Sequence, residues 1–457
     1  MIARDSFDLS RPRRLHMAGI GGSGMAPLAR ILAEEGHAIT GADACESVRV
    51  AGLRRAGFTV WTGSAGAVLP TGVEGLIHSA AVPESAPVLR GARRRGVAVL
   101  KYAQAVGQFS AGRRTYAVAG THGKTTTTGL LAYTFRTCGD DASCLVGGEV
   151  PQLGGGAAVG RSRSFIVEAC EYDRSFLNLT PEAAIVTNIE ADHLDYFRDL
   201  VEIREAFRDF AARVSMVLVL HESLYASIGR ARGIRARVVT YGTSPDVDLR
   251  ISIGGRRGGL TQFRAGGNDF ELAMPGLHNV LNAAAVIALC RERGMEMDGV
   301  RHALRAFSGV GRRLQVVGKP RGVPVVDDYA HHPTEVWAGL ETLRTEYRPR
   351  RLWCVFQPHQ YSRTEHFLKE FGRALAIADR VVIPDIFAAR DEEEREHRVS
   401  AQDLVDEVRS CGGNAVHLAD FGAIVDYVRT QVRTGDVLVT MGAGDVGDVA
   451  GRLAQAL

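Results

Sequence analysis

From Leu15 onward, short apolar runs alternate along the chain with glycine-rich turns and longer amphipathic stretches. The apolar runs fit strands buried on both faces of a sheet, and the amphipathic stretches fit helices that cover those faces. This alternation is typical of parallel sheets with crossover helices. The pattern therefore predicts an α/β chain that contains several such sheets.

The first predicted domain covers residues 1–112. It opens with a strand at residues 15–18, the turn GIGGSG and a helix over residues 25–35. Its other strands are predicted at residues 38–40, 58–61, 76–79 and 97–100.

The second predicted domain covers residues 113–318, and the third covers residues 319–457. The second has a strand at residues 115–119, the turn GTHGKT, a sheet-like stretch at residues 247–272 and a helix from about His278. Its other strands are predicted at residues 164–168, 183–188, 216–220 and 238–241. The third has strands at residues 323–327, 352–356, 380–383 and 437–441. The run at residues 390–398 mixes both charges and is interpreted as a solvated loop.

Length and composition agree with a multidomain globular protein. A chain of 457 residues is longer than one hydrophobic core usually serves. A hydrophobic share of 46% and a charged share of 23% exclude a disordered, fibrous or membrane protein. The sequence has no long uncharged apolar run, so no membrane insertion is predicted. The opening MIARDSFDLSRPRR lacks the apolar stretch of a secretory signal, and we interpret it as a short polar tail of a cytoplasmic protein.

The net charge and the cysteines limit which ligands and cross-links we expect. The net charge of +3 comes from both signs spread along the chain, which gives no basic stripe for nucleic acid but suits anionic phosphate ligands. The 7 cysteines are scattered without a CxxC pair. Reduced thiols are therefore expected rather than a disulfide framework or a zinc site.

The turn GTHGKTT, between an apolar strand and a helix-forming stretch, predicts a phosphate-binding loop. Backbone N–H groups of such a turn and the helix N-terminus bind phosphate, while Lys124 reaches the outer phosphates and Thr125 holds magnesium. Val118 stands where the standard pattern has glycine, and a chance glycine-rich turn is the alternative. The predicted ATP contacts in this loop are Gly120, Thr121, His122, Gly123, Lys124, Thr125 and Thr126.

Two further groups are expected near this loop. Glu168 ends one predicted strand, and His193 lies in the turn NIEADH after another. Ligands of open parallel sheets bind at the carboxyl ends of the strands, where these side chains could complete the coordination of Mg²⁺ around ATP. The alternative is that Glu168 is a surface acid and His193 a loop histidine with its own partners.

Two other classes of function remain open from these patterns. GIGGSG after a strand, with Asp43 some twenty residues beyond, also satisfies the dinucleotide fingerprint, so an NAD-dependent oxidoreductase is one rival. A nucleotide-driven binding switch without synthetic chemistry is the other. A phosphate-release assay separates all three, because only a ligase needs two further substrates together.

Nine motifs, in order along the chain, resemble the Mur ligase family. The resemblance extends from about Leu15 to the C-terminus. The motifs are GIGGSGM (19–25), AGTHGKTTTT (119–128), EACEYDRSFL (168–177), TNIEADHLDYF (187–197), PGLHNVLNAAA (275–285), GVGRRLQ (309–315), DDYAHHPTE (327–335), FQPHQYSRT (356–364) and MGAGD (441–445).

This resemblance implies an N-terminal Rossmann-like domain that binds a UDP-sugar, a central P-loop ATPase-type parallel sheet and a C-terminal Rossmann-like domain. It also implies an activity, ATP-dependent joining of L-alanine to the lactyl carboxylate of UDP-N-acetylmuramate through an acyl phosphate, in peptidoglycan precursor synthesis. Ligation of a recycled tripeptide to the same sugar is the alternative within the family. A monomer or a homodimer is expected.

The resemblance also implies roles for individual residues. Lys124, His193, His332 and Arg363 are the expected catalytic residues, and Thr125, Glu168 and His193 the magnesium ligands. The expected UDP-sugar contacts are Gly19, Gly21, Gly22, Ser23, Gly24, Met25, Asp43 and Ser79. Asn279, Asn282 and His278 are expected at adenine, with Arg313 near the nucleotide. His359 and Arg363 are expected at the amino acid, and Asp328, His331 and His332 at the cleft.

Two of these roles have structural alternatives. The stretch Pro333-Thr334-Glu335 opens a helix, so His331 and His332 could belong to its N-cap region. Arg363 could clamp the carboxylate of alanine by two parallel hydrogen bonds, or it could pair with Glu365 or Glu370 on the following helix.

The sequence departs from the family pattern at four places. No lysine occurs between Lys124 and Lys319, although several members use a modified lysine to bridge two metals. Gln360 stands where arginine is frequent, Ala42 where serine is common, and Gly63-Ser64 where Gly-His is common. The ligands of a second metal, the hold on the alanine carboxylate and the uridine contacts therefore stay open.

Overall fold

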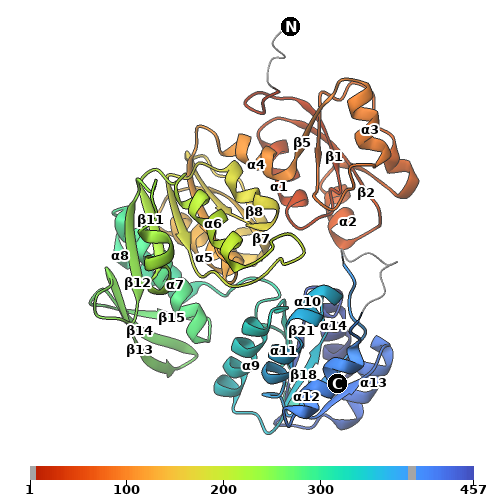
Figure 1. Cartoon of the computed structure of the whole chain (residues 1–457), viewed down its shortest axis with the longest axis vertical. Helices are drawn as coiled ribbons and strands as arrows, with labels where there is room; N and C mark the ends of the chain where they lie inside the picture. Colours follow the sequence, from red (N-terminus) through yellow and green to blue (C-terminus); the bar gives the residue numbers. More distant parts are fainter. Residues whose placement is uncertain (1–6, 390–397) are drawn as a thin grey trace. The chain divides into compact units, whose positions relative to one another are not determined.

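The computed structural model describes residues 7–389 and 398–457, and helices alternate with strands along most of these ranges (Figure 1). The chain divides into two compact units. One contains residues 1–190, 201–273 and 282–308, and the other contains residues 191–200, 274–281 and 309–457. The charged run predicted as a solvated loop lies outside the described residues, except for Arg398. Within the described ranges, no helix has the length and apolar character needed to cross a membrane.

The first sheet is parallel throughout, with strand order β3-β2-β1-β4-β5. Its strands are β1 Arg14–Ala18, β2 Ala38–Asp43, β3 Thr59–Thr62, β4 Gly75–His78 and β5 Ala98–Lys101. Its helices are α1 Met25–Glu34, α2 Val48–Arg55, α3 Pro87–Arg94 and α4 Tyr102–Ser110, with a 3₁₀ turn at Gly63–Ala67. Since β1 pairs with β2 on one side and β4 on the other, the strand order reverses at β1. Open α/β sheets bind ligands at the carboxyl edge of such a point.

The second sheet, in the same unit, has the order β15-β14-β13-β12-β11-β10-β6-β9-β7-β8 among the described strands. The strands from β12 to β7 are parallel, and antiparallel pairing occurs at β8 and in the hairpins of β13 to β15. The strands are β6 Arg114–Ala119, β7 Ser143–Val150, β8 Gly155–Ala158, β9 Ser164–Glu168, β10 Ala183–Val186, β11 Val217–His221, β12 Arg237–Gly242, β13 Leu249–Arg257, β14 Leu260–Ala265 and β15 Asn268–Leu272.

The helices that accompany this sheet include one that belongs to both units. α7 Leu277–Glu292 begins in the second unit and continues in the first from Asn282. The others are α5 Lys124–Thr137, α6 Leu200–Ala211 and α8 Met297–Ala306, with short helical turns at Pro151–Leu153, Tyr172–Asn178, Glu222–Leu224 and Tyr225–Gly229.

The third sheet forms the centre of the second unit, with order β16-β17-β21-β18-β19-β20 among the described residues. Its strands are β16 Gln315–Gly318, β17 Val325–Asp328, β18 Leu352–Phe356, β19 Arg380–Ile383, β20 Ala415–His417 and β21 Val437–Met441. Its helices are α9 Pro333–Tyr347, α10 Tyr361–His366, α11 Leu368–Leu375, α12 Ala401–Ser410, α13 Phe421–Gln431 and α14 Gly447–Ala456, with a 3₁₀ turn at Pro320–Gly322. Neighbouring residues of one strand, such as Trp353 and Cys354, enter separate apolar clusters because side chains alternate between the two faces.

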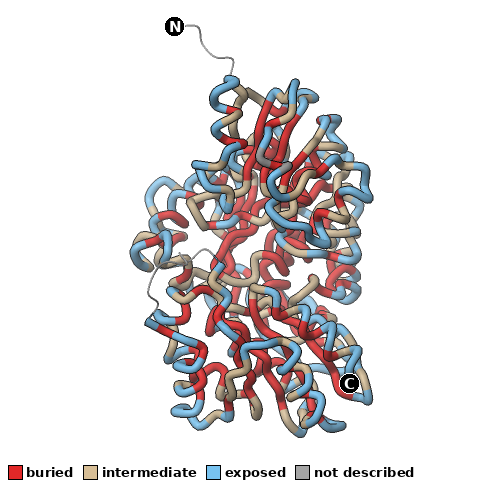
Figure 2. Tube along the Cα trace, turned by 90° about the vertical axis from the view of Figure 1, so that its right-hand side faces the viewer, coloured by how far each residue is buried: buried red, intermediate tan, exposed pale blue. Residues whose placement is uncertain are grey.

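Burial explains why most strands could be predicted from apolar runs in the sequence. Buried stretches run through the interior of the molecule (Figure 2), and every residue of β10 and of β18 is buried. The predicted strands are confirmed within one to three residues at each end. The prediction missed β7, β8, β16 and β20. β8 reads GGAA and β7 contains two adjacent glycines, so neither shows a continuous apolar run.

We keep the domain boundaries near residues 112 and 318 as a proposal. Strands before residue 112 form the first sheet, and strands between residues 114 and 272 form the second. β16 ends at Gly318 and pairs with β17, so this short strand belongs to the third sheet.

The described part of the opening segment is not the free polar tail that we predicted. The Gln108 side chain donates to the carbonyl of Phe7 at 3.0 Å and accepts from the N–H of Leu9 at 3.2 Å. Leu9 is buried, and the Phe7 ring lies where a Cβ on Gly75 would have to be. A phenylalanine and a leucine among polar neighbours are enough to dock this segment on the first sheet.

Candidate active site

The predicted phosphate loop links β6 to α5, and two of its glycines are required by geometry. Gly120 has φ +136° and Gly123 has φ +80°, values that L side chains rarely adopt. A Cβ on Gly120 would lie 2.0 Å from Oγ1 of Thr187, and one on Gly123 would lie 2.6 Å from Oδ1 of Asn282. The loop can therefore turn into α5 only with glycine at both positions, which leaves the helix N-terminus open to an anion.

The segment after β10 holds this loop in place. Asn188 accepts from the backbone N–H of His122 at 2.8 Å and donates to its carbonyl at 3.0 Å. The Thr187 hydroxyl donates to the same carbonyl at 2.6 Å. The Thr121 hydroxyl accepts from the N–H of Glu190 at 2.9 Å. The TNIEADH motif thus supports the phosphate loop through Thr187 and Asn188, a role that we did not predict.

Lys124, the first residue of α5, is bound to a buried acid that we also did not predict. Its Nζ donates to Oε1 of Glu171 at 3.0 Å and to the carbonyls of Gly120 at 2.5 Å and Thr121 at 3.0 Å. Burial alone would lower the pKa of Lys124, but Glu171, together with Cys170 and Glu168, holds the pKa above its usual value. Lys124 therefore stays charged at the loop, where phosphate is expected.

Thr125 and Glu168 meet beside this lysine, as the sequence suggested. The Thr125 hydroxyl donates to Oε1 of Glu168 at 3.2 Å, and Oε2 of Glu168 accepts from the N–H of Gly147 at 2.8 Å. A hydroxyl and a carboxylate are the hard oxygen ligands that Mg²⁺ prefers. The pair fits a magnesium ion on chemical grounds. Thr126, also predicted here, is buried in the first turn of α5.

The first glycine loop, between β1 and α1, is held by Asp43 and Ser79. Asp43 Oδ2 accepts from the N–H of Gly21 at 2.8 Å, and Gly19 has φ +74°, where an added Cβ would lie 3.0 Å from Cβ of Ser79. Asp43 therefore supports the loop itself, whereas a dinucleotide site uses this acid for a ribose hydroxyl. The other predicted contacts Gly22, Ser23 and Gly24 lie in the same turn, and Met25 is buried as the first residue of α1.

Tyr102, at the start of α4, lies against this first loop, and nothing in the sequence marked it. A Cβ on Gly24 would come within 2.8 Å of both Cζ and Oη of Tyr102. Burial raises the pKa of this phenol, and the Glu168 carboxylate adds to the effect. Tyr102 is thus a further residue that lies at the first glycine loop.

In the second unit, Arg363 forms a buried ion pair with an acid other than the two named as examples from the sequence. Its Nη2 donates to Oδ1 of Asp192 at 2.7 Å, and its Nη1 donates to Nδ1 of His359 at 3.1 Å. The side chains of Arg363 and Asp192 are 6% and 7% exposed. The acid that pairs with Arg363 is therefore neither Glu365 nor Glu370 but one that lies 171 positions away along the chain.

Asp192 also fixes the backbone of His193. Oδ1 of Asp192 accepts from the His193 N–H at 2.7 Å, and His193 has φ +53°, which is uncommon for a residue with a side chain. Burial alone would raise the pKa of Asp192, but His193 and Arg363 hold it well below its usual range. The acid therefore remains charged and orients both predicted functional residues.

The histidines of the DDYAHHPTE motif are bound into the start of α9. His332 is the N-cap: its Nδ1 accepts from the N–H of Thr334 at 3.3 Å, and its Nε2 donates to the carbonyl of Ala191 at 3.2 Å. Nδ1 of His331 donates to the carbonyl of Tyr329 at 3.0 Å, and burial lowers the pKa of His331 to about 4. The N-cap alternative is thus what the structure shows for His332.

Asp328 and Arg313 adjoin these histidines. Asp328 accepts from the N–H groups of Leu314 at 2.8 Å and Ala330 at 2.7 Å, and burial raises its pKa to about 6. Arg313 lies over the Tyr329 ring at 5.2 Å. Their hydrogen bonds and ring contact connect the turn after β17 to the segment before β16.

The residues expected at adenine fall on α7 and on both sides of the unit boundary. Asn279 donates to the carbonyl of Pro275 at 2.7 Å, and burial lowers the pKa of His278 to about 4. Asn282 lies at Gly123 of the phosphate loop. Of the three residues, only Asn282 belongs to the same unit as the predicted phosphate loop.

Gln360, expected near the alanine carboxylate, has a strained backbone. Its φ is +71°, and the residue is 2% exposed. Its N–H donates to the carbonyl of Phe387 at 2.8 Å, while its Nε2 has no partner among the described residues. Strain of this kind persists only where neighbouring contacts enforce it.

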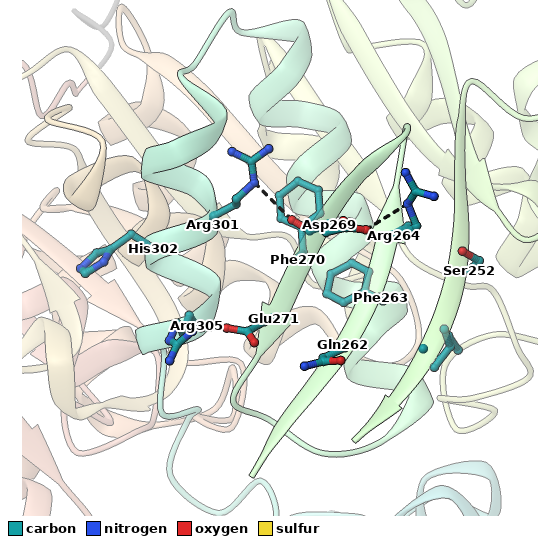
Figure 3. A pocket seen from close by; sticks show the side chains of 12 residues that line it. Ser252, Gln262, Phe263, Arg264, Asp269, Phe270, Glu271, Arg301, His302 and Arg305 are labelled. Carbon is teal, nitrogen blue, oxygen red and sulfur yellow. Dashed lines mark hydrogen bonds and ion pairs between the residues drawn. The ribbon is translucent and has the colours of Figure 1, made fainter. Parts of the chain in front are cut away.

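A groove of about 710 Å³ lies elsewhere, on the antiparallel part of the second sheet near α8 (Figure 3). Its arginines are already bound to neighbouring groups: Arg264 pairs with Asp269 at 2.9 Å, and Arg301 donates to the carbonyl of Asp269 at 3.2 Å. It contains none of the predicted site residues. We therefore assign the chemistry to the carboxyl edges of the sheets.

Comparison with known proteins shows the family of this chain. Three family models match: "Mur ligase family, catalytic domain" at residues 14–114, "Mur ligase middle domain" at residues 118–290 and "Mur ligase, glutamate ligase domain" at residues 312–444. A UDP-N-acetylmuramate–L-alanine ligase of Agathobacter rectalis is 38% identical over 97% of this chain and 98% of its own. One of Acidothermus cellulolyticus is 40% identical over 98% and 94%. The crystal structure of UDP-N-acetylmuramate-alanine ligase MurC from Thermotoga maritima has TM-score 0.83 at 26% identity and covers 97% of this chain and 98% of its own.

Proposed function

Because this chain belongs to the Mur ligase family, we propose that it uses ATP to join L-alanine to the lactyl carboxylate of UDP-N-acetylmuramate in peptidoglycan precursor synthesis. Relatives 38% and 40% identical over nearly the whole chain carry this activity in their names. The observation that carries the proposal is the grouping of Lys124, Thr125 and Glu168 at the start of α5. The first glycine loop lies within the family match, so we no longer interpret it as the dinucleotide site of an NAD-dependent oxidoreductase.

The chemistry requires activation of a carboxylate. An amine does not displace oxide from a carboxylate, so the lactyl carboxylate first attacks the γ-phosphate of ATP and ADP leaves. The neutral amine of alanine then attacks the acyl phosphate, and phosphate leaves from the tetrahedral intermediate. Such a reaction is accelerated mainly by positioning and by neutralising charge.

The groups of the first unit supply both effects in this proposal. The N–H groups of the phosphate loop and the charge of Lys124 bind the outer phosphates. Thr125 and Glu168 would hold magnesium, which neutralises phosphate charge, and His193 is proposed as a further ligand. The lysine that bridges two metals in several family members has no counterpart between Lys124 and Lys319.

Roles in the second unit complete the proposal. We assign the carboxylate of alanine to Arg363 and His359, with Gln360 as a neutral hydrogen-bond donor. The ion pair with Asp192 orients Arg363. The carboxylate of alanine would therefore share Arg363 with Asp192 or displace Asp192 from it. We place the reaction in the cytoplasm, where ATP and UDP-sugars occur, and expect a monomer or homodimer.

Phosphate release with different combinations of substrates tests the proposed function. We expect release only when ATP, UDP-N-acetylmuramate and an amino acid are present together, fastest with alanine and slower with serine or glycine. Release with ATP alone would favour a nucleotide-driven switch. Release with a tripeptide but not with alanine would favour the recycling ligase.

A further inference from the structure

The ammonium of Lys124 has a protein acceptor for each of its N–H donors. An ammonium carries three such donors. The carbonyls of Gly120 and Thr121 take two of them, and Glu171 takes the third, with its carboxylate oxygens 3.0 Å and 2.9 Å from Nζ. A phosphate that binds Lys124 therefore competes with Glu171.

Burial makes this pair different from a surface ion pair. The side chain of Glu171 is 3% exposed and that of Lys124 is 13% exposed. A charge buried to this extent is costly without a partner, and a buried pair is little screened by salt. The ion pair therefore restricts rotation about the four rotatable bonds of the Lys124 side chain.

The position of the carboxylate also affects the nucleotide. Lys124 is the first residue of α5, where the helix N-terminus attracts anions. Glu171 places a negative charge at the same point, and that charge repels phosphate oxygens. Glu171 thus has two opposite effects: it orients the ammonium, and it weakens the attraction of the loop for phosphate.

We propose that Glu171 is a positioning residue of the ligation reaction, which holds the Lys124 ammonium in the phosphate loop and yields it to the outer phosphates of ATP. The proposal rests on the proposed function, because it takes Lys124 as the phosphate-binding cation. It has a distinctive consequence. Removing the charge of Glu171 should strengthen nucleotide binding and slow phosphate transfer, whereas loss of a purely structural contact weakens both.

Glu171→Gln tests this consequence, because the amide keeps the shape of the side chain and removes its charge. We expect the Kd for ADP, measured by calorimetry at fixed Mg²⁺, to fall roughly tenfold. We expect kcat for phosphate release with all three substrates to fall by a similar factor. Glu171→Asp restores the charge and should return the ADP affinity toward that of the unchanged protein.

Glu182→Gln is the matched control. Glu182 precedes β10, whereas Thr187, which supports the phosphate loop, follows it. Glu182 is bound to Arg114 at 2.7 Å and to Arg293 at 3.3 Å. The same exchange there should lower Tm and leave the Kd for ADP unchanged.

An unchanged or higher Kd for ADP in Glu171→Gln would overturn the proposal, as would equal values for the glutamine and aspartate variants. ADP binding needs neither UDP-N-acetylmuramate nor alanine. If the unchanged protein binds ADP but releases no phosphate with all substrates present, the proposed function fails, while the binding comparison still decides the effect of Glu171.

Discussion

Two loops of the first unit, residues 19–24 and 120–123, have the same local plan. Each follows a central strand of its sheet and leads into a helix, β1 into α1 and β6 into α5. The first is held by the carboxylate of Asp43 and contains no cation. The second is held by the neutral groups of Thr187 and Asn188, and Lys124 follows it directly.

This difference teaches which ligand each loop suits. A diphosphate esterified at both ends carries less charge than the triphosphate of ATP. N–H groups and a helix dipole are sufficient for the former, even beside an acid such as Asp43. The latter needs a cation and, in the proposed function, a metal at Thr125 and Glu168. The loops share their place between a strand and a helix and are distinguished by the charge of the side chains that hold them.

The largest effect is expected from Lys124→Ala, which removes the cation that distinguishes the second loop. Phosphate release should fall by about a hundred- to a thousandfold. The Kd for UDP-N-acetylmuramate should stay nearly constant, because this ligand is assigned to the first loop. Turnover retained within about tenfold would contradict the role of Lys124.

Exchanging one glycine in each loop should separate the two ligands. Gly120→Ala forces a Cβ to within 2.0 Å of the Thr187 hydroxyl and should weaken ADP binding by about ten- to a hundredfold. Gly21→Ala brings a Cβ to 2.9 Å from the Asp43 carboxylate and should weaken UDP-N-acetylmuramate binding instead. Calorimetric titration of both ligands on both variants checks the exchange. Equal losses for the two ligands in either variant would point to general unfolding.

The strands beneath the loops should differ in their response to acid. His16 is the third residue of β1, Tyr116 is the third residue of β6, and both are fully buried. Burial lowers the pKa of His16 from 6.5 to about 4 and raises that of Tyr116, so the tyrosine stays neutral. The unfolded chain binds a proton at His16 at higher pH than the folded chain, and the stabilisation by neutral His16 is lost as pH falls from 6.5 toward 4.

The expected loss between pH 7 and pH 5 is about 2 kcal/mol for this residue. Thermal unfolding of the original protein and of His16→Leu at these two pH values measures it, and the variant should show the smaller pH dependence. His302→Gln, an exposed histidine of the same unit, is the control and should retain the original dependence. An identical pH dependence of stability in the original protein and in His16→Leu would show that His16 does not contribute to it.

The smallest effect concerns magnesium, which the proposal assigns to the second loop alone. Glu168→Ala should raise the Mg²⁺ concentration needed for half-maximal phosphate release by about tenfold. His193→Ala should act in the same direction if this histidine is a ligand. Asp43→Asn in the first loop should leave the magnesium titration unchanged. An unchanged titration in both the Glu168 and His193 variants would return these residues to structural roles.

The sequence was sufficient where the determining features are local. A strand, a glycine turn and a helix follow each other within some twenty residues, so both loops could be placed from apolar runs and glycines. The meeting of Thr125 and Glu168 could also be predicted, because both follow parallel strands at one edge of a sheet. β8, which reads GGAA, could not be predicted, since its pairing with β7 and not its own pattern makes it a strand.

The sequence was insufficient where a partner comes from distant packing. We weighed Glu365 and Glu370 for Arg363 because they are close along the chain, but Asp192 pairs with it. Glu171 is bound to Lys124 because the chain turns back after β9, and Tyr102 lies against Gly24 because α4 starts there. Neither contact leaves a periodic signal, and one sequence does not show which acids approach a given cation.

The docked segment at residues 7–9 has a practical consequence for fusion proteins. A tag or reporter joined before Phe7 leaves the Phe7 ring against Gly75 and the Gln108 side chain between its two backbone partners. A junction placed after Leu9 removes those contacts to α4, whose first residue, Tyr102, lies at the first glycine loop. The choice of junction can therefore alter sugar-nucleotide affinity in an assay although the fusion point is outside the proposed site.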